Sequence, residues 1–109
     1  MRFLLIQTPD PEKATPPSKE LYANMQKLVE RETEAGILVM TGGISPLSRG
    51  GARVRQSGRK FSVVEPGDSR EVTGGFAIVD VPSREEAIEA ARRFFEVAGD
   101  GEAEIHQIG

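Results

Sequence analysis

The chain has 109 residues, and its 14 Lys and Arg against 17 Asp and Glu give a formal net charge of −3. This length fits one domain, residues 1–109, with a single core. Cysteine is absent, which excludes disulfides and thiolate chemistry and fits a cytoplasmic protein. The acidic balance argues against nucleic acid as a partner. No apolar run is long enough to span a membrane or to form a signal-peptide core.

The first part of the chain predicts a strand, a helix and a second strand. Residues 2–7 form a short apolar run of strand length before a Pro-rich turn. Ser18 is a candidate N-cap for a helix over residues 19–35, and Gly36 is its expected left-handed terminator. A second apolar run, residues 37–40, predicts the next strand and ends at a Gly pair. The helix has one apolar face, made of Leu21, Met25, Leu28 and Val29.

The middle of the chain predicts a β-hairpin. Residues 52–56 and 60–64 alternate in character on either side of a turn at Gly58. This alternation places Arg53 and Arg55 on the same face of the hairpin.

The last part predicts the strongest strand, a helix and a final strand. Residues 76–81 are almost continuously apolar, and residues 102–108 form the final strand. Ser83 and Glu86 have the spacing of a capping box. The helix that follows carries an apolar stripe of Ala87, Ile88, Ala91, Phe94, Phe95 and Ala98.

The order β-α-β-β-β-α-β predicts a ferredoxin-like α+β fold with an antiparallel sheet and both helices on one sheet face. The strands at residues 4–6 and 76–81 are apolar on both faces, so both faces need cover. Two helices cover only one face, and nothing else in the chain remains to cover the other. We therefore expect a homodimer, with a pocket between the two paired sheets.

The order of several segments resembles the YCII-related family, including its branch named for an Asp-Gly-Pro-Phe motif. The matching segments are residues 3–6, 35–39, 42–46, 74–81, 85–87 and 103–108. The resemblance implies a ferredoxin-like fold that dimerises into an α/β barrel. It also implies either a small-molecule enzyme or a protein that accompanies an alternative sigma factor. The named motif itself is missing from residues 65–75, and the family's proposed His-Asp pair has no counterpart because the first helix lacks His.

Five residues are candidates for a site. His106 is the only histidine and shares a strand face with Glu104, which predicts a general acid or base oriented by a carboxylate. Arg53 and Arg55 are candidates for clamping a substrate oxygen anion. Glu71 is a candidate base at the pocket mouth. Each also has a plain structural explanation, as a solvated strand or loop residue.

Two functions follow from these residues. The first is a cofactor-free lyase or isomerase that acts on a small oxygenated molecule, with His106 and Glu71 catalytic and Arg53, Arg55 and Glu104 binding substrate. The second is a non-catalytic accessory or regulatory binding module. A single histidine and the absence of cysteine disfavour a metal site, and we expect neither an organic cofactor nor a membrane partner.

Overall fold

The computed structural model describes residues 1–10, 12, 18–64 and 74–109. The elements in chain order are β1 (Arg2–Pro9), α1 (Lys19–Glu34), β2 (Leu38–Ile44), β3 (Arg53–Ser57), β4 (Lys60–Val64), β5 (Gly74–Asp80), α2 (Arg84–Ala98) and β6 (Gly101–Ile108). The predicted α+β class is confirmed. The predicted order β-α-β-β-β-α-β has one strand too few, since four strands, β2 to β5, lie between the helices. The predicted hairpin with its two strands is confirmed as β3 and β4.

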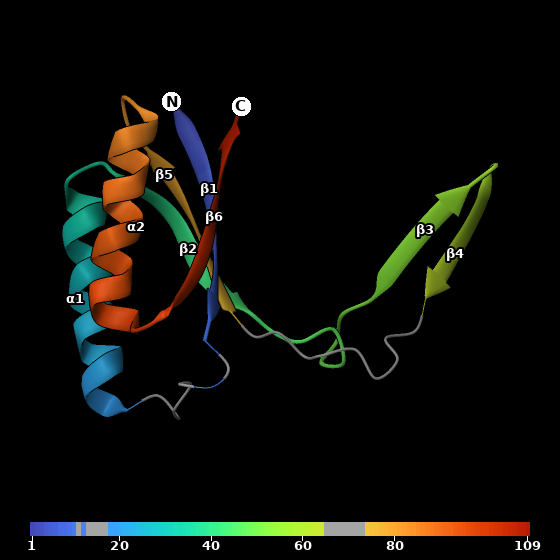
Figure 1. Cartoon of the computed structure of the whole chain (residues 1–109), viewed down its shortest axis with the longest axis horizontal. Helices are drawn as coiled ribbons and strands as arrows, with labels where there is room; N and C mark the ends of the chain where they lie inside the picture. The colour runs from blue at the N-terminus through green and yellow to red at the C-terminus, as the bar shows by residue number, and fades with distance from the viewer. Residues whose placement is uncertain (11, 13–17, 65–73) are drawn as a thin grey trace.

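Four strands form an antiparallel sheet in the order β2-β5-β1-β6. Both helices cover the same face of this sheet, as their apolar stripes predict (Figure 1). Each helix connects two strands that have a third strand between them, which is the ferredoxin-like arrangement. The sheet stays open at β2 and β6. The expected barrel is therefore not a property of the single chain.

Short capping contacts fix where the helices begin and end. Ser18 accepts a hydrogen bond from the Leu21 amide at 3.0 Å, and Ser83 accepts one from the Glu86 amide at 3.2 Å. After α1, Gly36 adopts a φ of 75°, which a residue with a side chain rarely adopts. Both predicted N-caps and the predicted terminator of α1 are confirmed.

The core lies between the helices and the sheet. Val79 at its centre is fully buried. The other buried apolar residues come from three strands, the two helices and the start of the β5–α2 connection: Phe3, Leu5, Leu28, Leu38, Ala77, Val81, Ala87, Ala90, Ala91 and Phe94. Because side chains alternate along a strand, the neighbours of these strand residues must point to the other sheet face.

That other face, the open face, carries an apolar row of Leu4, Ile6, Met40, Phe76 and Ile78. No element of the described chain packs over this row, so Met40 is 56% exposed and its four neighbours are half-buried. The predicted apolar character of the strands on both faces is thus confirmed. Burying this row requires something other than the two helices.

The hairpin β3–β4, residues 53–64, forms an arm that projects from the open side of the sheet, away from the helices (Figure 1). We call the rest of the folded chain the body. The arm makes extensive contacts only between its own two strands. Its turn has Gly58 at a φ of 54° and Arg59 at 67°, the conformation of a type I′ hairpin. The radius of gyration is 16.0 Å, against about 13 Å for a compact chain of this length, which reflects this projection.

One prediction about local structure is wrong, since the second strand does not end at its glycine pair. Strand β2 runs through Gly42 and Gly43 to Ile44, because it pairs with β5 along this stretch.

Two charged residues lie between the helices: Glu32 is buried and Arg93 is partly buried. The Glu32 side chain is 5% exposed, and its carboxylate accepts two hydrogen bonds from the Arg93 guanidinium, which links α1 to α2. In the described part of the chain, neither helix has the length and apolar character to cross a membrane.

Candidate functional site

The open face of β6 carries a histidine–carboxylate pair. His106 Nε2 lies 3.1 Å from Glu104 Oε2, and both side chains are more than half exposed. The two-residue period of a strand brings them together, as the sequence predicts. A carboxylate on one ring nitrogen orients the imidazole and leaves the other nitrogen to exchange a proton with a bound molecule.

The pair borders the apolar row. His106 lies opposite Leu4 across the β1–β6 ladder, and Glu104 lies opposite Ile6. Cross-strand partners share a sheet face, so the histidine, the carboxylate and the two aliphatic side chains form one surface. A small molecule can contact the apolar side chains of this surface and lie next to the imidazole at its edge, which can transfer a proton.

Phe76 extends the same surface toward β2. It pairs with Gly42, and a Cβ at Gly42 would lie 2.8 Å from the Phe76 ring, so the ring covers this glycine. The absence of a side chain at Gly42 therefore leaves space for the aromatic ring on the open face. The sequence contained this signal in the pair Gly42 and Gly43, although the sequence predicted that the strand ends there.

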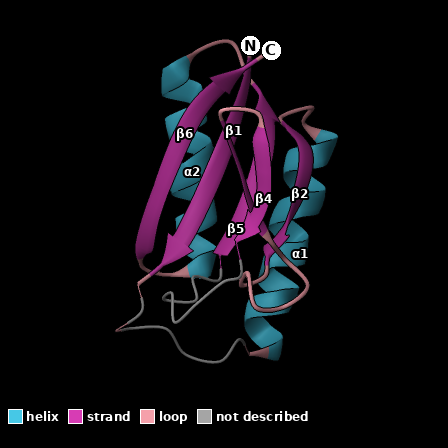
Figure 2. Cartoon of the chain, turned by 90° about the vertical axis from the view of Figure 1, so that its right-hand side faces the viewer, coloured by secondary structure: helices cyan, strands magenta, loops and turns pink. Residues whose placement is uncertain are grey.

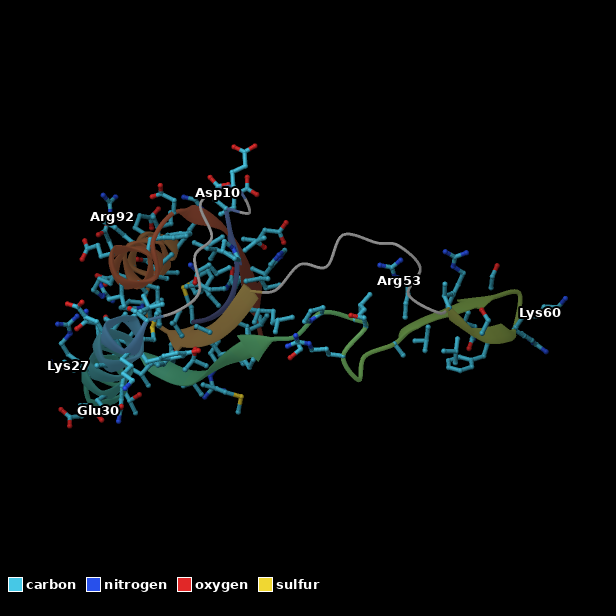
Figure 3. All side chains as sticks on the ribbon, turned by 90° about the horizontal axis from the view of Figure 1, so that it is seen from below. Asp10, Lys27, Glu30, Arg53, Lys60 and Arg92 are labelled. Carbon is cyan, nitrogen blue, oxygen red and sulfur yellow. The ribbon has the colours of Figure 1, made fainter. Side chains whose placement is uncertain are left out.

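Arg53 and Arg55 lie on the arm, and the structure does not bring them to the histidine of the same chain. Their predicted common face is confirmed, because Arg53 pairs with Val64 and Arg55 with Ser62. Figure 3 shows Arg53 and Lys60 well separated from the side chains of the body. Glu71 lies outside the described residues.

A hollow of about 820 Å³ lies on the helix side of the sheet, between α1, α2 and the ends of the strands. Residues from both helices and the sheet line it, among them Leu5, Tyr22, Met25, Thr41 and Phe94. No pattern in the sequence predicts this hollow. Its lining offers little acid–base chemistry: the Thr41 hydroxyl donates to the Phe76 carbonyl at 2.8 Å, and Asp100 is the carboxylate among its described lining residues.

Among the residues that the structure describes, no three His, Asp or Glu side chains are grouped so that they can hold a metal ion. The groups for chemistry on the open face are therefore an imidazole, carboxylates and apolar surface. Such a set suits binding and proton transfer on an oxygenated molecule.

Comparison with known proteins gives a family. A search of curated proteins found no match to the chain. The family model for the YCII-related domain matches residues 1–108, nearly the whole length. This agrees with the order of segments in the sequence and with the ferredoxin-like topology. The chain belongs to the YCII-related domain family.

Proposed function

We propose that the protein is a homodimer whose two open sheet faces lie against each other as an α/β barrel and bind a small oxygenated molecule between them. The His106–Glu104 pair on the apolar open face is the observation that carries this proposal. Stacked sheets lie about 10 Å apart, and a gap of this width that the facing side chains fill only partly can hold a small ring beside His106. His106 meets an oxygen of the ligand, and the apolar row contacts its carbon skeleton.

The catalytic form of this proposal is a cofactor-free lyase or isomerase. In it, His106 moves a proton on the bound molecule while Glu104 holds the ring. Glu71 keeps its proposed role as a second base on the sequence argument alone. The non-catalytic form, an accessory or regulatory binding module, is supported by the exposure of His106 and Glu104 in the single chain, 56% and 75% for the side chains.

Methionine methyl NMR tests where a ligand binds, because one methionine marks the open face and another marks the helix-side hollow. Met40 lies on the open face and Met25 lines the helix-side hollow. With salicylate and catechol as probes, we expect the Met40 methyl signal to shift and the Met25 signal to stay. His106→Ala should weaken binding about tenfold or more, the cost of one charge-assisted hydrogen bond.

Gln107→Ala is the matched control, since Gln107 is the exposed neighbour of His106 on the opposite strand face. A ligand-induced shift at Met25 in place of Met40 would move the site to the helix side. A monomer at micromolar concentration in sedimentation would contradict the homodimer. If a turnover assay is found, unchanged rates in both His106→Ala and Glu71→Ala would remove the proposed catalytic set.

A further inference from the structure

The arm has an apolar face that nothing in the described chain covers. Val54 pairs with Val63 and Gln56 pairs with Phe61, which puts these side chains on the face opposite Arg53 and Arg55. Val54, Val63 and Phe61 are 57%, 56% and 66% exposed. A lone two-stranded hairpin is at best marginally stable in water, so the arm needs a partner for its stability.

The arm and the rest of the chain carry opposite charge. The arm, residues 53–64, contains four Lys and Arg and no Asp or Glu. The remaining residues have ten basic against 17 acidic side chains, a net charge of −7. Among the described residues, Arg53 and Arg55 form no ion pair within the chain. A second copy of this chain supplies the acidic surface that these guanidinium groups lack.

The β6 edge matches β3 residue by residue. Among the described strands, β6 lies at the sheet edge and pairs with β1 alone, so one row of its backbone groups is available for pairing. Glu102 and Glu104 point to the open face, while Ala103 and Ile105 point to the helix side. In β3, Arg53 and Arg55 alternate with Val54 in the same way.

A strand that pairs with β6 so that arginine faces glutamate therefore also sets valine beside alanine or isoleucine. This holds for either strand direction, because the period of both strands is two residues. The other sheet edge, β2, presents Met40, Gly42 and Ile44 on the open face and has no charge to match arginine. Glutamates on an edge strand disfavour pairing with most other strands, and they favour pairing with a strand that carries basic residues.

We propose that β3 of each arm adds to the β6 edge of a second copy, so that the partner's Arg53 and the partner's Arg55 complete the open-face site beside His106. This rests on the proposed function and deepens it, since the ligand oxygen at His106 then meets guanidinium groups and is anionic. Figures 1 and 2 agree that the arm stands off from the sheet on its open side. In a face-to-face dimer that position belongs to the layer of the partner's sheet.

Charge reversal on two separate chains tests the pairing. One variant is Arg53→Glu/Arg55→Glu, and the other is Glu102→Arg/Glu104→Arg. Alone, each places like charges at both arm–edge contacts of its dimer, and we expect the dimer dissociation constant in sedimentation to rise about tenfold or more. An equimolar mixture has opposite charges at both contacts and should return to within about threefold of the wild-type constant.

The control is Arg59→Glu/Lys60→Glu, which makes the same change in net charge at the arm's turn, and its effect should be clearly smaller. Failure of the mixture to restore dimerisation overturns the proposal. The proposal is also overturned if dimerisation is restored only in a chain that carries all four reversals, because the arm then pairs with its own body. A wild-type dimer with the Met40 shift but no response to arm charge removes the arm pairing and leaves the proposed function. A wild-type monomer removes both.

Discussion

The body and the arm both contain antiparallel strands with an apolar face, but only the body buries that face within the described chain. In the body, the helices cover one face of the sheet, and Val79 is completely buried. In the arm, the hydrogen-bonded ladder of β3 and β4 is complete, yet Phe61 and two valines are exposed. The backbone pattern alone therefore does not distinguish them. What differs is whether a second layer exists within the same chain.

The chain therefore has two kinds of apolar surface, one inside the core and one exposed. The core surface stabilises the fold of the single chain. The open face and the arm face are not covered by any described part of the chain, and in the proposed dimer they serve association, since large exposed apolar patches of this kind mark interaction sites. Substitutions in the two regions should therefore separate stability from dimerisation.

The largest expected contrast uses one aromatic residue from each region. Phe94→Ala removes a ring that is 9% exposed in the core and should lower the free energy of unfolding by about 3–5 kcal/mol. Phe61→Ala removes a ring that is 66% exposed and should change the unfolding of the body by less than about 0.5 kcal/mol. Urea denaturation followed by circular dichroism measures both. Equal losses of stability would show that the arm belongs to the core.

A somewhat smaller effect is expected at the buried ion pair. Glu32→Ala leaves the Arg93 guanidinium without its carboxylate between the helices and should cost about 3 kcal/mol. Glu30→Ala is the control two residues away, since Glu30 is exposed and accepts a 3.4 Å hydrogen bond from Gln26. It should cost about 0.5 kcal/mol or less. If thermal unfolding gives similar midpoints for both variants, the Glu32–Arg93 pair does not hold the helices together.

Removing the arm altogether should also change the free energy of unfolding of the body only slightly. Ile44 and Gly74 are opposite each other in the β2–β5 ladder, so an Asn-Gly turn can join them directly. We expect the shortened chain to unfold cooperatively with a free energy within about 1 kcal/mol of the body in the full chain, because loop length has a weak effect on stability. Loss of cooperative unfolding would mean that the arm region stabilises the body.

Local patterns in the sequence predicted most of the fold. Ser18 and Ser83 cap the helices by contacts within one turn, and the His106–Glu104 contact follows from the strand period alone. The burial of Glu32 was not predictable in this way, since it depends on where α2 crosses α1. The position of Arg53 relative to His106 was equally inaccessible, because no local rule sets how far a hairpin stands from its sheet.

The junction at Ile44 and Gly74 also has a consequence for how the protein changes over time. The core of the body does not include the arm, which makes extensive contacts only between its own strands. The folding of the body therefore places few constraints on the sequence of the arm. Substitutions in the arm are then selected by the surface they meet and not by the core. If the proposed pairing of arm and edge holds, two duplicated copies of such a chain can acquire separate partners by exchanging a few arm and edge charges, while their bodies stay alike.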